Sequence, residues 1–278
     1  MRRSLILFES ARLALKHPGR TVGQTIKDPT WALKRIRIRW ILQQNMKEQS
    51  QFIAYLTGAT AEDIGMMYNQ LKSNISLFEH LDQCFQRVEM ELQRGQIPDT
   101  MGLSAVRYGE ASMLYVITRA LKPKTIVETG VGHGVSATFF LQALEDNAEE
   151  GRLHSIDLPL SGQQLADGSV YLLPEGKQSG WMIPEHLRHR WHLVLGSSSE
   201  KLLPLLESLG EVDVFMHDSL HTEENMMWEY KSAWPFIRKE GLLLSHDVSW
   251  NAAFLEFCRK VDAPVGNVAM VIGGIVKR

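Results

Sequence analysis

The 278-residue sequence has little cysteine and no long apolar run. Its two cysteines, Cys84 and Cys258, lie far apart and form no C-x-x-C motif, which argues against a disulfide scaffold and a thiolate zinc site. No run reaches the roughly 18 apolar residues that a membrane-spanning helix needs. Near the start, Glu9 and Arg12 interrupt a short apolar stretch and no cleavage site follows, so no signal peptide is expected. These deficits predict a cytoplasmic protein.

The net charge of the chain is small, −2, but the charged residues are unevenly distributed. Residues 1–48 hold eleven Lys and Arg against three acidic residues, so this basic arm carries +8 and the remaining chain −10. Such asymmetry is typical of a segment that contacts an anionic partner. Nucleic acid is the least favoured partner because no nucleic-acid-binding motif accompanies the charge. Peripheral membrane contact through residues 1–48 ranks below packing on the chain's own domain or in a homodimer.

The patterns divide the chain into a helical N-terminal extension, residues 1–103, and an α/β domain, residues 104–278. Hydrophobic residues recur every three or four positions between Thr60 and Arg94, and Thr60 followed by acidic residues is a typical helix start. The segment 95–104 contains Pro98 and Gly102 and marks the boundary. Beyond it, strands are expected at 125–127, 153–157, 191–195, 212–217 and 241–247, helices at 108–121, 184–190, 200–209, 223–236 and 251–261, and a closing hairpin at 264–268 and 270–276.

The stretch 125–144 is the one around which the domain is organised. A β-branched strand leads into an E-x-G-x-G-x-G turn, from Glu128 to Gly134, and then into an apolar helix. Glycines let a backbone approach a ligand closely, and the start of a helix offers unpaired N–H groups. The order differs from the dinucleotide fingerprint G-x-G-x-x-G, and a carboxylate two residues before the first glycine suits a cationic ligand group. A glycine-rich turn without a ligand is the competing interpretation.

Polar residues at later strand ends extend this pattern. Asp157 ends the second strand, 23 residues after Gly134, where a carboxylate can accept the two hydroxyls of a ribose. The long segment 158–183 that follows is a candidate substrate lid. Gly196 and Ser197 follow the third strand; they suit contact with an adenine ring, and an ordinary helix N-cap is the alternative.

Two further strands end in His-Asp pairs, at 217–218 and 246–247, and His221 comes three residues after Asp218. In a doubly wound sheet both pairs emerge at the carboxyl edge beside the glycine turn. Carboxylates that meet there need a compensating cation, and two Asp with neutral donors suit Mg²⁺ or Mn²⁺. The alternative is that these His and Asp residues only satisfy one another and cap neighbouring helices.

Together these motifs resemble those of the class I S-adenosylmethionine (SAM)-dependent methyltransferases. The E-x-G-x-G-x-G turn is similar to their motif I, and the acids after strands four and five resemble the catechol O-methyltransferase-like, small-molecule O-methyltransferase branch. The resemblance covers residues 105–278 and implies a Rossmann-like doubly wound sheet of about seven mostly parallel strands. It implies SAM as cofactor, with these predicted contacts: Glu128, Gly130, Gly132, Gly134, Ser136, Asp157, Gly196, Ser197 and Asp218. Tyr108, Gly109 and Glu110 are weaker candidates.

The resemblance also implies the reacting groups. Asp218 and Asp247 match the metal-binding acids of that branch, for Mg²⁺ or Mn²⁺. Val248 stands where the branch has Asn, so Asn251 is the substitute candidate. His221 occupies the position of the catalytic base and, with Asp218, forms the predicted catalytic pair; its imidazole titrates near neutral pH without a special environment. The predicted reaction is methyl transfer to a hydroxyl of a small molecule or glycan-type acceptor. The alternative is a SAM- or metal-binding relative without methyl transfer, such as a cephalosporin hydroxylase-like protein or a regulatory module.

Overall fold

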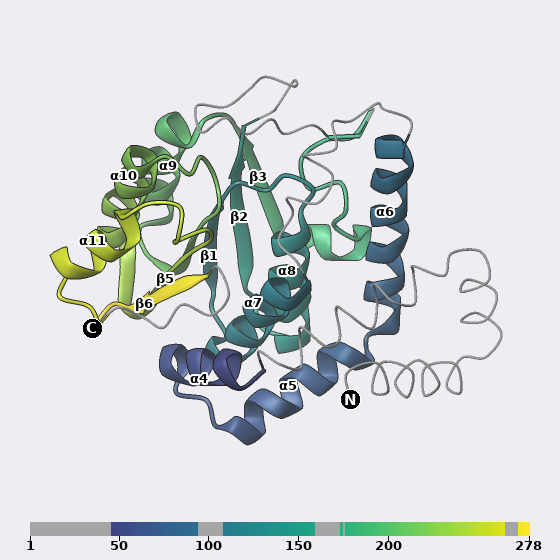
Figure 1. The fold of residues 1–278 in the computed structure, drawn as a ribbon, viewed down its shortest axis with the longest axis horizontal. Helices are drawn as coiled ribbons and strands as arrows, with labels where there is room; N and C mark the ends of the chain where they lie inside the picture. Colours follow the sequence, from purple (N-terminus) through teal and green to yellow (C-terminus); the bar gives the residue numbers. More distant parts are fainter. Residues whose placement is uncertain (1–45, 94–107, 159–172, 175, 265–271) are drawn as a thin grey trace, which may run out of the picture. The chain divides into compact units, whose positions relative to one another are not determined.

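The computed structural model describes residues 46–93, 108–158, 173–174, 176–264 and 272–278 (Figure 1). Internal contacts divide the chain into two units, Met1–Glu48 and Gln49–Arg278. Nearly all of the basic arm, the predicted boundary loop, most of the segment 158–183 and one arm of the predicted hairpin lie outside the described residues. Among the described residues, no helix is both long and apolar enough to cross a membrane.

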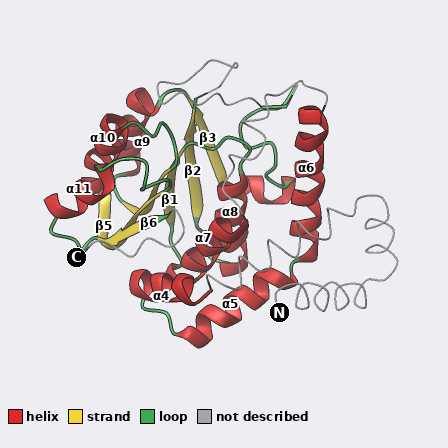
Figure 2. Cartoon of the chain, in the orientation of Figure 1, coloured by secondary structure: helices red, strands yellow, loops and turns green. Residues whose placement is uncertain are grey.

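A six-stranded sheet forms the centre of the second unit, in the order β3-β2-β1-β4-β5-β6 (Figures 1 and 2). The first five strands run parallel and β6 pairs antiparallel with β5. Their bounds are β1 Thr125–Thr129, β2 Arg152–Asp157, β3 Trp191–Leu195, β4 Val212–His217, β5 Ile237–Ser245 and β6 Gly273–Val276. Strand order reverses between β1 and β4, and open α/β sheets bind ligands outside the carboxyl ends of the strands at such a point. The doubly wound α/β prediction is confirmed.

Helices cover both faces of this sheet (Figure 1). On one face, α9, α10 and α11 form a core with the inward side chains of β1, β2, β4 and β5, including Val127, Phe215 and Leu243. On the other face α7 packs against α8, and α8 contacts β2. Their bounds are α7 Tyr108–Leu121, α8 Val135–Asn147, α9 Ser198–Leu209, α10 Glu223–Ala233 and α11 Ala253–Lys260. Burial on both sides of the sheet explains the apolar runs 214–216 in β4 and 242–244 in β5.

Among the described residues, the helices that come before α7 are α4 Met46–Thr57, α5 Ala61–Ser73 and α6 Ile75–Gln93. Thr60 caps α5, because its side chain accepts a hydrogen bond from the backbone N–H of Asp63, as expected from the sequence. The apolar face of α5 includes Tyr68 and Leu71, which are buried, and α5 contacts α7. Gln49 onward therefore belongs to the unit that contains the sheet. The domain boundary predicted at 103/104 falls outside the described residues and stays a prediction.

Several element boundaries differ from those expected. Helix α10 ends at Ala233, because Pro235 cannot continue the backbone ladder and forms the short 3-10 helix η2, Trp234–Phe236. Strand β5 then begins at Ile237, four residues early, with an irregular register against β4 between Val212 and Val214. Helix α9 begins two residues earlier than expected, at Ser198, and ends at Leu209 as expected, with Pro204 inside it. Strand β6 supplies the second arm of the expected hairpin.

Candidate active site at the carboxyl edge of the sheet

The glycine turn between β1 and α8 is built from left-handed backbone. Gly130, Gly132 and Gly134 have φ values of 84°, 52° and 89°, which side chains larger than hydrogen rarely tolerate. Gly130 also faces the start of the loop after β4: a Cβ there would lie 1.9 Å from the carbonyl oxygen of Asp218. The predicted turn is therefore in backbone contact with the predicted catalytic loop, and only glycine allows that approach.

Glu128 is completely buried beneath this turn. Ser136 donates a hydrogen bond to its Oε1 at 2.5 Å, and Ser155 donates one to its Oε2 at 2.9 Å. Burial raises the pKa of Glu128 to about 8, although the two hydroxyl donors act in the opposite direction. The sequence suggested a carboxylate that faces a cationic ligand, and the structure places this group between β1, β2 and α8, where burial favours its protonated form. The predicted cofactor contacts of Glu128 and Ser136 stay predictions.

Asp157 lies beside the turn as expected, but protein groups already use both of its carboxylate oxygens. Its Oδ1 accepts the backbone N–H of Val131 at 2.9 Å, and its Oδ2 accepts the hydroxyl of Ser179. Burial raises its pKa, and these hydrogen bonds oppose the shift. Gly196 joins the same corner, since its N–H donates to the carbonyl of Asp157 at 2.9 Å. Ser197 precedes α9 without a side-chain cap and instead contacts Ser199 at 3.0 Å.

Residues 176–183 pack directly on the glycine turn. Gly180 N–H donates to the carbonyl of Gly132 at 2.8 Å, and Met182 N–H donates to the carbonyl of His133 at 3.0 Å. Trp181 also donates from Nε1 to Nδ1 of His133 at 2.8 Å. The end of the predicted lid segment thus lies next to the predicted cofactor turn.

The two His-Asp pairs meet at the carboxyl edge with His221, as predicted. Nε2 of His221 lies 3.6 Å from Oδ1 of Asp218 and 3.8 Å from Oδ2 of Asp247. Nδ1 of His246 lies 3.2 Å and 3.4 Å from the same two oxygens. We call Asp218, His221, His246 and Asp247 the His-Asp cluster. Asp247 also has a left-handed φ of 52°, a conformation that is uncommon outside glycine and occurs often at functional sites.

Electrostatic coupling within the His-Asp cluster is strong. Burial alone would raise the pKa of Asp218, but the adjacent imidazoles of His246 and His221 lower it well below its usual range. Burial alone would lower the pKa of His246, but Asp218, Asp247 and the buried Glu110 raise it to about 12. The pair is therefore a carboxylate and an imidazolium near neutral pH, and His246 supplies one positive charge to the carboxylates.

A divalent cation fits part of this cluster. Potential ligand atoms of Asp218, His221 and His246 all lie within 4.8 Å of one another, and oxygen with imidazole nitrogen is a donor set that Mn²⁺ and related ions accept. Asn251, predicted as a ligand, has protein partners: its Nδ2 donates to the carbonyl of His221 at 3.0 Å and its Oδ1 accepts the N–H of Ala253 at 2.9 Å. The group of Asp218, His221 and His246 shares Asp218 with the predicted metal ligands, and the roles of Asp247 and Asn251 stay predictions.

Three residues near the cluster were missed or undervalued from the sequence. Glu110 on α7 is buried with Oε2 3.7 Å from Nε2 of His246. Trp250 is 55% exposed, and its ring centroid lies 5.1 Å from that of His221. Glu229 on α10 is fully buried and bonded to His217 at 2.6 Å. For Trp250, a tryptophan three residues after a strand-end acid was a usable signal. Glu110 was a weaker cofactor-contact candidate, and for Glu229 the sequence offered no signal beyond an acid in a helix.

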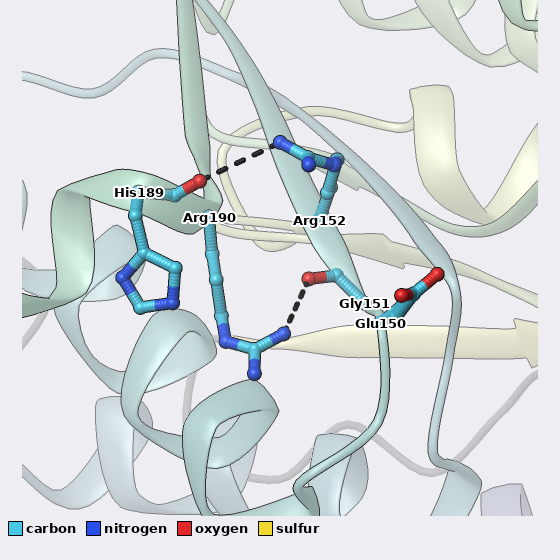
Figure 3. Close-up of a pocket in the computed structure, with 5 residues that line it drawn as sticks. All are labelled: Glu150, Gly151, Arg152, His189 and Arg190. Carbon is cyan, nitrogen blue, oxygen red and sulfur yellow. Dashed lines mark hydrogen bonds between the residues drawn. The ribbon is translucent and has the colours of Figure 1, made fainter.

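A surface hollow of about 310 Å³ lies at the opposite, amino-terminal end of the strands, where β2 begins and η1, Glu185–Arg190, ends (Figure 3). It is lined by Glu150, Gly151, Arg152, His189 and Arg190. Arg190 is already engaged there, donating to Glu145 at 2.7 Å and to the carbonyl of Gly151 at 3.2 Å. Because doubly wound sheets bind their ligands at the carboxyl edge, this hollow is not the candidate active site.

Residues 127–248 match a family model described as a methyltransferase domain. Among solved structures, the SAH-bound Podospora anserina methyltransferase PaMTH1 is similar, with a TM-score of 0.50 and 15% identity over 79% of this chain and 97% of that one. The O-methyltransferase from Bacillus cereus in complex with SAH has a TM-score of 0.46 and 16% identity over 69% and 91%. The O-methyltransferase TomG from Streptomyces achromogenes, in complex with SAM, has a TM-score of 0.48 and 16% identity over 70% and 89%.

No curated protein matches the sequence significantly. At 15% identity, the likeness to PaMTH1 shows the fold. The family match confirms the resemblance to methyltransferases for the part of the chain that carries β1 to β5.

Proposed function

We propose that this chain, whose residues 127–248 match a methyltransferase domain model, is a SAM-dependent methyltransferase that acts on a hydroxyl of a small molecule. The observation that supports this most directly is the backbone contact between Gly130 and Asp218. A cofactor bound on the glycine turn and a hydroxyl bound at the His-Asp cluster would be neighbours. Holding two reactants in that way removes much of the entropic barrier to a bimolecular reaction.

Bound SAM would supply an electrophilic methyl group on its sulfonium. His221 is the proposed general base, which takes the proton of the acceptor hydroxyl at its imidazole. Asp218, whose pKa lies well below its usual range, stays ionised and stabilises the imidazolium that forms on His221, 3.6 Å away. Proton transfer by a positioned imidazole of this kind typically contributes about 10²–10⁴-fold to a rate.

The proposed mechanism has two versions, which differ in the cation that compensates the charge of the carboxylates. If Mg²⁺ or Mn²⁺ were held by Asp218, His221 and His246, with Asp247 beside them, both imidazoles would be neutral ligands, and the metal would take the place of His221 as base by lowering the pKa of a coordinated hydroxyl. Without a metal, the imidazolium of His246 is the positive charge next to the two carboxylates. A chelator separates these two versions of the proposal.

The acceptor would lie against the exposed ring of Trp250, which flanks His221. Indole rings stack on flat ligand faces, both aromatic rings and the apolar faces of sugars. Both small molecules and glycan-type acceptors therefore belong in the substrate test. The basic arm, for which we propose packing or a peripheral membrane contact, lies outside the described residues.

The decisive measurement is formation of S-adenosylhomocysteine from SAM with a panel of phenolic, sugar and aliphatic hydroxyl acceptors, with and without EDTA. Turnover with at least one acceptor is the expected result, and loss of turnover in EDTA with recovery by Mg²⁺ or Mn²⁺ would establish the metal. Tight SAM binding without turnover on any acceptor would favour the alternative, a SAM-binding relative without methyl transfer.

Cofactor binding is tested separately by calorimetry. Asp157→Ala should weaken SAM by about 1–3 kcal/mol, because a charged hydrogen-bond acceptor is lost. Glu128→Ala should weaken SAM to a similar extent if the buried carboxyl group supports the turn. Glu207→Ala, which removes an exposed acid on α9, is the matched control. Unchanged affinity in both site variants would overturn the assigned cofactor site.

A further inference from the structure

Glu229 on α10 is a completely buried carboxyl group at the centre of a network of donors. Its Oε2 accepts hydrogen bonds from Oγ1 of Thr129 at 2.5 Å and from Nδ1 of His217 at 2.6 Å. Its Oε1 accepts from Oγ of Ser219 at 2.6 Å and from Nδ2 of Asn225 at 3.2 Å. These four donors use both oxygens, which is what a buried carboxylate requires.

The network joins the two halves of the candidate active site. Thr129 is the last residue of β1 and leads into the glycine turn. His217 and Ser219 flank Asp218, so Glu229 fixes the backbone on both sides of that residue. The link is reinforced along the main chain, where Asp218 N–H donates to the carbonyl of Thr129 at 2.8 Å.

Glu229 also lies behind the proposed base. The His217 ring, held by Glu229, packs edge-on against His221 with ring centroids 5.4 Å apart at an interplanar angle of 76°. The exposed ring of Trp250 is another aromatic neighbour of His221, with ring centroids 5.1 Å apart. Rotation of His221 is therefore limited by one aromatic neighbour whose own position depends on Glu229.

We propose that Glu229 is a positioning residue for methyl transfer: it holds Asp218 and His221 in their reactive arrangement beside the glycine turn. This inference rests on the proposed function. Glu229 does not itself reach the reacting atoms, because its side chain is enclosed and its carboxylate oxygens are bonded to protein groups. Its contribution is geometric, and displacements of about 1 Å at such sites can lower rates about 10²-fold.

Glu229→Gln is the test variant. The amide has the same shape but only one acceptor oxygen, so two of the four donors lose their partner or meet another N–H group. The expected result is a fall in kcat of about 10–100-fold, with SAM affinity within twofold of the wild type. Glu229→Asp keeps the two acceptor oxygens on a shorter stem and should recover part of the lost kcat. Glu224→Gln, an exposed acid on the same helix, is the control and should match the wild type.

A second readout does not depend on turnover. Imidazole ¹H–¹⁵N spectra of the full chain report the environment of His221, assigned by its absence in His221→Ala. In Glu229→Gln the His221 signals should shift or broaden, while those of the exposed His189 stay in place. In Glu224→Gln all of them should remain unchanged.

The two readouts separate this inference from the proposed function. A wild-type protein that methylates no hydroxyl refutes the function, and the imidazole spectra still decide whether Glu229 positions His221. Unchanged His221 signals in a folded Glu229→Gln or Glu229→Asp variant overturn the inference. A uniform loss of kcat, SAM affinity and thermal stability with unmoved His221 signals assigns Glu229 a purely structural role and overturns it as well.

Discussion

The buried carboxyl group of Glu128 leads to a quantitative prediction about stability. Replacing it with glutamine keeps the size and planarity of the side chain but removes its titration. The amide can donate to one of the two serine hydroxyls and accept from the other, so Ser136 and Ser155 keep partners. When the difference in unfolding free energy between the variant and the wild type is plotted against pH, any pH-independent cost of the substitution is a constant offset. The titration of Glu128 appears as a slope.

The magnitude follows from the pKa shift. Burial raises the pKa of Glu128 from 4.5 to about 8 in the folded protein. Below pH 4.5 both the folded and unfolded states hold the proton, so the residue costs nothing. Between pH 4.5 and about 8 only the folded state holds it, and the free energy of unfolding falls by about 1.4 kcal/mol per pH unit, to a ceiling of about 5 kcal/mol. Above pH 8 both states lose the proton and the loss levels off.

The assay is urea unfolding at intervals from pH 5 to pH 8.5, followed by tryptophan fluorescence, for wild type, Glu128→Gln and the exposed control Glu207→Gln. The difference between Glu128→Gln and wild type should move in favour of the variant by several kcal/mol as pH rises. Glu207→Gln should show no such drift. Parallel stability curves for wild type and Glu128→Gln, within about 0.5 kcal/mol across this range, would refute a buried neutral Glu128.

Three further predictions concern the site. Gly130→Ala should destabilise the fold well beyond the roughly 1–2 kcal/mol of left-handed strain, because its Cβ would lie 1.9 Å from Asp218 O; Gly58→Ala, with φ 72° and open surroundings, should lose only the strain in thermal denaturation. His221→Ala should lower single-turnover methyl transfer roughly 10²–10⁴-fold with SAM affinity little changed, whereas full activity would eliminate His221 as the base. Trp250→Ala should raise the acceptor KM roughly 2–10-fold at similar kcat, and an unchanged KM would move the acceptor elsewhere.

Local patterns were sufficient for the architecture and for the choice of site. Before Glu128 the chain has a β-branched run, which predicts a strand. The glycines that follow predict a turn, and the apolar spacing after them predicts a helix. Parallel strands end at one edge, so the His-Asp pairs at 217–218 and 246–247 could be expected to meet beside the turn. Their meeting is confirmed by the distances within the His-Asp cluster.

The predicted end of α10 and the predicted start of β5 were wrong, each for an identifiable physical reason. Pro235 ends α10 earlier than its apolar periodicity indicates, and β5 gains four residues because its pairing with β4 continues past an irregular register. Asn251 was predicted as a ligand from its place in the sequence, and that role stays a prediction. The hydrogen bonds of its amide to the carbonyl of His221 and to the N–H of Ala253 could not be read from the spacing.

What the sequence determined by itself is which chemical groups stand at the carboxyl ends of the strands, since that depends on backbone period and strand direction alone. Only the tertiary structure decided how those groups are charged and held. Burial in the surrounding core raises the pKa of Glu128 to about 8, against the opposing effect of the hydroxyl groups of Ser136 and Ser155. Glu229 binds Thr129 from 100 positions away in the chain. Partners so distant are brought together by the packing of the whole sheet against its helices, and the cost of burying a charge depends on which donors that packing supplies.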